Sequence, residues 1–417
     1  MSIEKLYIHL MRAYRSMWFP PAAYAAGTIL ILSLAPIVEP IVPFALETLI
    51  EPNAVEKILG ILASSMLAVA IFSLGTMVSA LQASASSATP RVRVLLTEDR
   101  TAQTAISTFI GAFIFSVLGI VGLSTGYYSD AGRFIIFTIS LAVIAIVIAT
   151  LISWINRLSK MGGVGEAVDL VERAATKAFT LAARDPYYGG KALTHVPESA
   201  TGICLETFGY IQHINGSQLG EMAEKLGFNL LLVARPGSYA APNRPVVLVE
   251  SPVEDSDAAK IRNAFVVGDA RTFEEDPRFG LLVLSEIASR ALSPSVNDPG
   301  TAIDVVSTLV RVLANWQQRV KEQEPQIRFD KLYVADLQVE DLLGDAFRWI
   351  SRDGAGLLEV SVKVQKALAT LCAVDPEKFG PAAKNMSREA LGRSKLAMSA
   401  ESDLLCLTEE QQKVGLD

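Results

Sequence analysis

The stretch that decides the fold runs from Phe134 to Ile155 and reads FIIFTISLAVIAIVIATLISWI. It contains no charged residue, and a helix needs about 20 apolar residues to cross the hydrocarbon core of a bilayer. Three apolar runs of the same kind precede it, at residues 18–38, 58–81 and 104–126, and none follows Asn156. The sequence therefore predicts a membrane protein with a four-helix transmembrane domain over residues 1–157.

The composition of the whole chain agrees with this fold class. Hydrophobic residues make up 51% of the 417 residues and charged residues 19%, whereas soluble domains carry about 25% charged residues. A net charge of -7 argues against a nucleic-acid partner, because such partners select basic surfaces. Cys204, Cys372 and Cys406 are far apart and odd in number, so they indicate neither a metal site nor a disulfide framework.

The lysines and arginines near the ends of the spans predict the orientation, because translocation of positive charge is disfavoured. One side of the membrane receives Lys5, Arg12, Arg15, Arg91, Arg93, Arg100, Arg157 and Lys160, and the other only Lys57 and Arg133. Both termini are therefore expected in the cytoplasm. The segment Leu6 to Met17 interleaves arginines with tyrosines and predicts an interfacial helix, with an ordinary polar tail as the alternative.

The rest of the chain predicts a cytoplasmic α+β domain in three parts. Residues 158–200 are expected to form a helical stalk and linker, since apolar residues recur at helical spacing from Gly165 to Arg184. Residues 201–270 hold β-type runs at 202–214, 228–234 and 245–249, and tight turns between them favour a small antiparallel β-barrel-like module. Residues 271–417 predict mainly helices, with one strand at 331–337.

Two Asp-Pro motifs stand out in this C-terminal part. They are GDARTFEEDPRFG, residues 268–280, and ALSPSVNDPGTA, residues 291–302. Asp276 and Asp298 are suited to cap helices, with Pro277 and Pro299 at the first helical position, where a missing N–H costs nothing. This structural interpretation explains the spacing without any chemistry.

The charged residues around these motifs allow a second interpretation. They form a candidate polar knot of Arg271, Glu274, Glu275, Asp276, Arg278, Arg290, Asn297 and Asp298. Such a group is either an ion-pair network that fixes two helices or, because arginines lie beside helix N-termini, a site for an anionic ligand.

These motifs also carry a resemblance to a known family. The strings SALQASAS at 79–86 leading into Pro90-Arg91, Phe109-Ile110-Gly111, RTFEEDPRFG at 271–280 and ALSPSVNDP at 291–299 resemble the bacterial membrane-protein family catalogued as domain of unknown function 2254. Asp269-Ala270 and Ser295 are minor departures from its pattern. The resemblance implies a bacterial inner-membrane protein with four spans and a cytoplasmic domain. It implies no activity, ligand or catalytic residue.

The second span holds a ladder of small residues, Gly75, Ser79, Ala83 and Ser87. Small residues at every fourth position let helices approach closely, and Ser107 and Gly111 of the third span are the expected partners. The alternative places this span around the axis of a homo-oligomer. A pore would then be lined by Ser65, Thr76, Ser79 and Ser86 and constricted by Phe72.

The absence of certain residue types and motifs argues against several functions. The cores of the four spans contain no Asp, Glu, Lys, Arg or His, and ion-coupled carriers usually keep such residues at the membrane midplane. His9, His195 and His213 are isolated, so no metal site or other cofactor is expected. No nucleophile or phosphate-binding motif is present, and no enzymatic activity is expected.

Two hypotheses of function follow. The first is a homo-oligomeric inner-membrane ion channel or pore with a cytoplasmic gating domain. The alternative is a membrane-anchored structural or regulatory protein whose cytoplasmic domain binds a protein partner or a small anion. In both, the lipid bilayer is a partner. A water-accessible second span would favour the channel, and a dry interface of Gly, Ser and Ala would favour the alternative.

Overall fold

The computed structural model describes residues 19–38, 52–97, 99–413 and 415. The expected interfacial helix at Leu6–Met17 lies outside these residues. The chain divides into two compact units, Met1–Glu166 and Ala167–Asp417. Each unit is described by itself.

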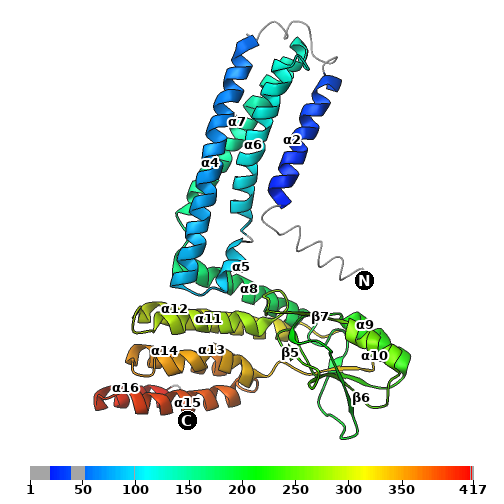
Figure 1. The fold of residues 1–417 in the computed structure, drawn as a ribbon. Helices are drawn as coiled ribbons and strands as arrows, with labels where there is room; N and C mark the ends of the chain where they lie inside the picture. The colour runs from blue at the N-terminus through cyan, green and yellow to red at the C-terminus, as the bar shows by residue number, and fades with distance from the viewer. Residues whose placement is uncertain (1–18, 39–51, 98, 414, 416–417) are drawn as a thin grey trace. The chain divides into compact units, whose positions relative to one another are not determined.

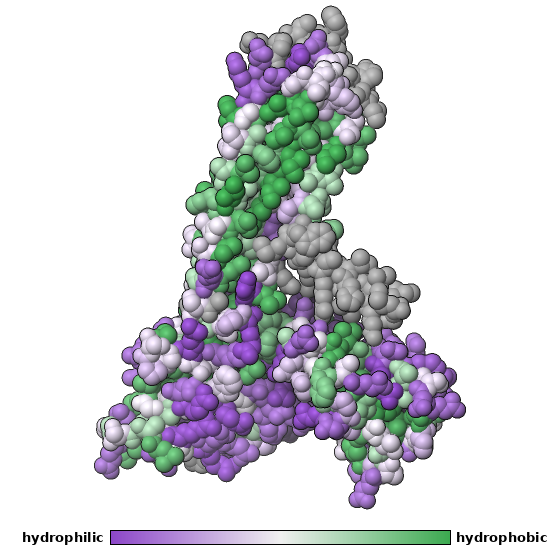
Figure 2. Space-filling model, viewed as in Figure 1, coloured by the Kyte–Doolittle hydropathy of each residue, from purple (hydrophilic) through white to green (hydrophobic). Residues whose placement is uncertain are grey.

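The described part of the first unit consists of helices (Figure 1). They are α2 (Phe19–Val38), α4 (Pro52–Ser87), α5 (Val92–Thr97), α6 (Arg100–Ser124) and α7 (Asp130–Leu158). The spans Asn53–Ser84, Arg100–Ser124 and Asp130–Leu158 are long and apolar enough to cross a membrane, and Phe19–Leu34 is a shorter apolar helix. Figure 2 shows hydrophobic side chains gathered over these helices. Three of the four predicted spans are thus supported by length and composition, and the first stays a prediction.

Helix α4 is longer than the span predicted for it. Its 36 residues correspond to about 54 Å at the usual helical rise, while the hydrocarbon core of a bilayer is about 30 Å thick. The predicted span at 58–81 lies within α4, and the helix continues through the Ser/Ala segment to Ser87.

Helix α6 occupies the centre of the first unit and packs against α2, α4 and α7. Small residues allow the close contacts. A Cβ built on Gly111 would lie 3.4 Å from the Tyr24 Cβ of α2, and one on Gly119 would lie 3.0 Å from Leu59 of α4. The hydroxyl of Tyr128, in the loop after α6, donates to the carbonyl of Leu32 at 3.0 Å.

The second unit begins within α8 (Val164–Arg184), the helix expected over 165–184. Its apolar face is buried, with Phe179 packed against Trp316 at 5.5 Å between ring centroids. A tight turn follows α8, in which the N–H of Gly189 donates to the Asp185 carboxylate at 2.7 Å. Tyr188 in this turn has a φ of 53°, which is rare for a residue with a side chain.

Two sheets and two short helices follow. The strands are β1 (Lys191–Ala192), β2 (Thr201–Cys204), β3 (Gly209–Ile214), β4 (Leu230–Leu232), β5 (Tyr239–Ala240), β6 (Pro245–Val249), β7 (Phe265–Gly268) and β8 (Leu332–Val334). The helices are α9 (Gly216–Leu226) and α10 (Asp255–Asn263). One sheet has the order β1-β8-β4-β6-β2 and the other β5-β3-β7. Strand β8 pairs parallel with β1 and β4, and the other ladders are antiparallel.

The predicted barrel-like module is wrong, because the strands form two separate sheets and no closed barrel. The run 202–214 is not one strand: it breaks after Cys204, and β2 and β3 lie in different sheets. Strand β3 begins at Gly209, which has a φ of 148°. Gly209 lies so close to β7 that a Cβ would be 2.7 Å from the Gly268 carbonyl oxygen. In addition, β1 and β8 join the larger sheet from outside residues 201–270.

The remaining helices are arranged in pairs that stack on one another (Figure 1). They are α11 (Pro277–Ala291), α12 (Pro299–Glu322), α13 (Val339–Asp353), α14 (Leu358–Val374), α15 (Gly380–Ala397) and α16 (Glu401–Lys413). Helix α11 packs on α13 and α12 on α14, while α15 covers both α13 and α14. The prediction of a mainly helical C-terminal part with one strand is confirmed, and the strand within 331–337 is β8.

Candidate functional site

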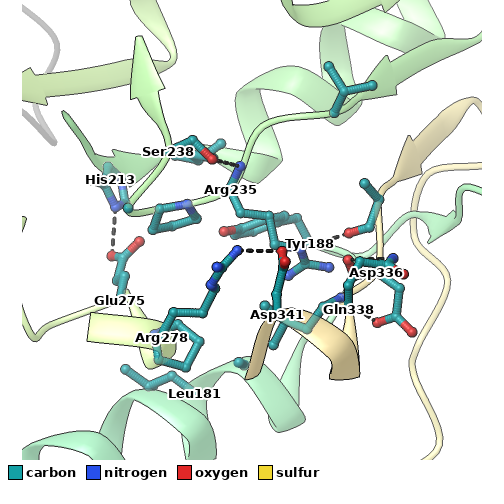
Figure 3. Close-up of a pocket in the computed structure, with 18 of the residues that line it drawn as sticks. Leu181, Tyr188, His213, Arg235, Ser238, Glu275, Arg278, Asp336, Gln338 and Asp341 are labelled. Carbon is teal, nitrogen blue, oxygen red and sulfur yellow. Dashed lines mark hydrogen bonds and ion pairs between the residues drawn. The ribbon is translucent and has the colours of Figure 1, made fainter. Parts of the chain in front are cut away.

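A pocket of about 600 Å³ lies within the second unit. The end of α8, strand β3, the turn after β4, the segment before α11 and the segment between β8 and α13 all line it (Figure 3). Eight of its 20 lining residues are apolar. Its volume falls in the range of about 300–1,000 Å³ that is usual for small-molecule sites.

The turn after β4 brings Arg235 to the pocket. The N–H of Ser238 donates to the Arg235 carbonyl at 3.0 Å, and the Arg235 N–H donates to the Ser238 hydroxyl at 3.1 Å. Gly237 has a φ of 90°, and a Cβ built on it would lie 2.1 Å from a carboxylate oxygen of Asp276. Only glycine fits this position, which combines a left-handed backbone with a close contact.

The first Asp-Pro motif forms the neighbouring wall. Asp276 caps α11 by accepting the Phe279 N–H at 3.2 Å, with Pro277 in the first turn, as predicted. Arg271 binds the same carboxylate through two hydrogen bonds, Nε to Oδ2 at 2.7 Å and Nη2 to Oδ1 at 3.0 Å. Asp276 is 2% exposed. Burial raises its pKa, and the hydrogen bonds from Arg271 and Phe279 oppose that rise.

The second Asp-Pro motif makes the same helix cap at a solvent-exposed position. Asp298 accepts the Thr301 N–H at 3.1 Å and the Thr301 hydroxyl at 2.6 Å, with Pro299 in the first turn of α12, as predicted. These hydrogen bonds hold the pKa of the exposed Asp298 carboxyl below its usual value. Asn297 precedes it with a φ of 50°.

The structure does not bring the eight residues of the candidate polar knot together. Arg271, Glu275 and Arg278 line the pocket beside the buried Asp276. Arg290, in the last turn of α11, and Asn297 and Asp298, beyond that end, are exposed; the 15 residues of α11 span about 22 Å. Glu274 is exposed and does not line the pocket.

Each carboxylate that lines the pocket has a basic partner. Glu275 contacts His213 Nδ1 at 2.7 Å, and Asp341 contacts Arg278 at 2.6 Å. Outside the lining, Arg328 binds Asp185 at 2.8 Å and Lys378 binds Asp336 at 2.9 Å. Arg278 also binds Asp345, at 2.7 Å.

Arg235 differs from the other cations of the pocket. Its Nε donates to the Ala335 carbonyl at 2.7 Å and its Nη2 to the Pro186 carbonyl at 2.8 Å. Within the described residues, no carboxylate oxygen lies within 4.0 Å of this guanidinium. Burial lowers the pKa of Arg235, although arginine stays protonated in proteins.

Tyr188 lines the pocket near Arg235 (Figure 3). It packs closely against Gly216 of α9, where a Cβ would lie 2.2 Å from the Tyr188 Cβ. Burial raises the pKa of the Tyr188 hydroxyl, so the group stays a neutral donor at pH 7.

Sequence reasoning missed both residues. Neither belongs to a recognisable motif, since Tyr188 lies in the turn after α8 and Arg235 in the turn after β4.

The pore-lining candidates of α4 satisfy their hydroxyls locally. Ser65, Thr76, Ser79 and Ser86 donate to carbonyls three or four residues earlier in their own helix, at 2.7, 2.9, 3.0 and 2.8 Å. Phe72 is 64% exposed. These contacts neither require a pore nor preclude one.

Gly75 and Ser79 of the small-residue ladder of α4 point away from the rest of the first unit, whereas a Cβ built on Gly162 would lie 3.6 Å from the Ala83 Cβ. A Cβ built on Gly75 would meet nothing within 4 Å, and Ser79 and Ala83 are exposed. The side chain of Ser87 lies outside the described set. Ser107 of α6 is buried and donates to its own helix at 2.5 Å, and Gly111 lies against α2. The close contact of Gly111 is therefore with α2 and not with the ladder.

Comparison with known proteins gives relatives without an assigned activity. The chain is 30% identical over 241 residues to "Uncharacterized protein Rv1290c" of Mycobacterium tuberculosis and to "Uncharacterized protein Mb1321c" of Mycobacterium bovis. Each alignment covers 53% of this chain and 45% of the relative, so the chain matches less than half of those proteins. No solved structure matches the chain. The family described as "Predicted membrane protein (DUF2254)" matches residues 14–370, and the chain belongs to this family.

Proposed function

We propose that this chain is a membrane-anchored regulatory protein whose C-terminal unit binds a small anion in the pocket at Arg235. One observation carries the proposal: Arg235 lines a pocket of about 600 Å³ and has no carboxylate within 4.0 Å among the described residues. The other arginines of the pocket, Arg271 and Arg278, each bind a carboxylate.

Electrostatics favours an anion at this position. Arg235 is partly buried, a desolvated charge without a counterion is costly, and two backbone carbonyls satisfy only part of the five N–H donors of a guanidinium. A bound carboxylate or phosphate would supply the missing charge and accept the remaining hydrogen bonds. Of the pocket carboxylates, Asp336 favours the charged form of Arg235 only from beyond 4.0 Å, and each of the four already has a basic partner.

Replacing Arg235 with Met should abolish the stabilisation of the protein by anions. A ligand at 100 times its Kd stabilises the native state by about 2.7 kcal/mol, which raises the Tm of a unit of this size by about 5–10 °C. The measurement is thermal unfolding of the full chain in detergent with acetate, phosphate or sulfate added, each compared with chloride at equal ionic strength.

Arg319→Met is the matched control, since Arg319 is an exposed arginine of α12 outside the pocket. It should respond to anions as the wild type does. If no anion shifts the wild-type Tm, or if the shift is the same in Arg235→Met, the proposed site is wrong.

We also propose that the protein lies in the bacterial inner membrane with both termini in the cytoplasm, which rests on the lysine and arginine asymmetry. In a cysteine-free background, Asn53→Cys should react with an impermeant thiol reagent in intact cells, and Gly163→Cys should not. Labelling of Gly163→Cys alone would reverse the orientation.

A second candidate function is a homo-oligomeric channel built around α4. The observation that favours it is that Gly75 and Ser79 face outward, with Phe72 64% exposed. Small residues on an exposed helix face suit close packing between copies, and a ring of Phe72 could close a path by excluding water. The internal hydrogen bonds of the hydroxyls suit dry packing equally well, so this candidate stands second.

The channel is tested by two substitutions. Gly75→Leu should dissociate the oligomer, as measured by native mass in mild detergent, because a bulky side chain separates the helices. Phe72→Ser should raise the leak current in reconstituted bilayers. A monomeric wild type, or no current for Na⁺, K⁺ or Cl⁻ in either protein, would remove this candidate.

A further inference from the structure

We infer that the ligand of the Arg235 pocket is an organic monoanion, a carboxylate with an apolar body, and not a polyanion such as inorganic phosphate or a nucleotide. This inference rests on the proposed anion site and specifies its ligand. Three features of the pocket carry it: the free edge of one guanidinium, the charges around it and the apolar walls.

The free edge of Arg235 suits a carboxylate. Its Nε and one N–H of Nη2 bind the carbonyls of Ala335 and Pro186. Among the described residues, the side-chain hydrogen bonds of Arg235 are these two, which leave the edge formed by Nη1 and the second N–H of Nη2 unbonded. Two parallel N–H groups match the two oxygens of a carboxylate. The Tyr188 hydroxyl, near Arg235, is a further donor in this wall (Figure 3).

The charges around Arg235 disfavour a second negative group. Four carboxylates line the same pocket, those of Asp185, Glu275, Asp336 and Asp341. Each has a basic partner, but Asp341 shares Arg278 with Asp345, and His213 is charged only when protonated. These pairs therefore leave no excess positive charge beyond Arg235. Triphosphate or phosphate sites usually gather several unpaired cations or backbone N–H groups. A polyanion here would place its additional charges near carboxylates.

The lining residues and the volume of the pocket favour a ligand with an apolar body. Apolar lining residues include Ile214, Val233, Pro236, Pro277, Ala335 and Leu337. The volume of about 600 Å³ is in the range of pockets that bind small organic molecules. Each methylene group buried against such walls contributes about 0.8 kcal/mol, which corresponds to about a fourfold gain in affinity.

The test is a homologous series of straight-chain carboxylates. Acetate, butanoate and hexanoate are titrated against the full chain in lipid nanodiscs by calorimetry, beside inorganic phosphate, ATP and the neutral hexanamide. Affinity should rise about fourfold per methylene, and hexanoate should bind more tightly than phosphate, ATP and hexanamide.

Substitutions in the pocket test where the carboxylate and the alkyl chain of the ligand bind. Arg235→Met should weaken hexanoate binding by about 10- to 100-fold, the worth of a charged hydrogen bond. Arg235→Lys keeps the charge but not the paired N–H groups, so its affinity for hexanoate should lie between those of Arg235→Met and the wild type. Val233→Thr keeps the shape but adds a hydroxyl, so it should weaken hexanoate and leave acetate unchanged. Arg319→Met should leave every affinity unchanged.

The failures of the inference and of the proposed function are distinguishable. If phosphate or ATP binds more tightly than hexanoate in an Arg235-dependent way, or if affinity does not change with chain length, the monoanion inference is overturned and the anion site stands. If hexanamide binds as tightly as hexanoate, or if no anion binds at all, the proposed function and the inference both fall.

Discussion

Replacing Asp276 with Ala should lower the free energy of unfolding of the C-terminal unit by about 3–5 kcal/mol. The substitution leaves the guanidinium of Arg271, whose side chain is 18% exposed, without its carboxylate. It also removes the hydrogen bond that caps α11 at Phe279. Removing one member of a buried ion pair is costly because the remaining charge stays desolvated.

Asp298→Ala is the matched control, since it removes the cap of α12 from the same Asp-Pro motif. Asp298 is exposed and has no arginine partner among the residues that the structure describes, so the loss should be about 1 kcal/mol, the usual value of a helix cap. Urea unfolding of the full chain, followed by tryptophan fluorescence, measures both. Equal losses for the two variants would contradict the role given to burial and to Arg271.

Replacing Arg157 with Met should destabilise the first unit by a similar amount, about 3–5 kcal/mol. The Arg157 guanidinium binds Asp99 at 2.6 Å and also contacts Glu166. The side chains of these two acids are only 10% and 9% exposed. Without Arg157, two carboxylates would be left close together and poorly solvated, at the point where α6, α7 and α8 begin or end.

Arg133→Met provides the comparison on the same helix. Arg133 pairs with Asp130 at 2.7 Å, but the Asp130 side chain is 70% exposed, and surface ion pairs contribute about 0–1 kcal/mol. The temperature at which the detergent-solubilised protein loses its helical circular dichroism measures both variants. If Arg157→Met melts within the error of Arg133→Met, the buried cluster is not stabilising the unit.

The sequence alone predicted the features that depend only on neighbouring residues in the chain. The run 134–155 has no charged residue, so hydropathy alone identified it as part of α7. Asp276 and Asp298 were recognised as caps, because a cap depends on neighbours three residues away. The same reasoning could not distinguish them: burial and the contact with Arg271 depend on how the whole unit packs.

Long-range pairing explains the errors. Strand β8 pairs parallel with β1 and β4 although α11 and α12 separate it from them in sequence. No turn signal in residues 201–270 could indicate such a partner, so tight turns suggested a local barrel instead. The pocket was missed for the same reason: Tyr188, Arg235 and Asp336 come from separate segments and meet only in the folded unit.

The central claim, that Arg235 binds an anion, is tested most directly by an experimental map of the full chain with bound hexanoate. The account predicts carboxylate density about 2.7–2.9 Å from the Nη atoms of Arg235, with the alkyl chain toward Val233 and Leu337. A surface hollow of about 580 Å³, lined in part by Arg184 and Arg328, offers a different location. Density in that hollow, or a pocket that holds only water at saturating hexanoate, would contradict the account.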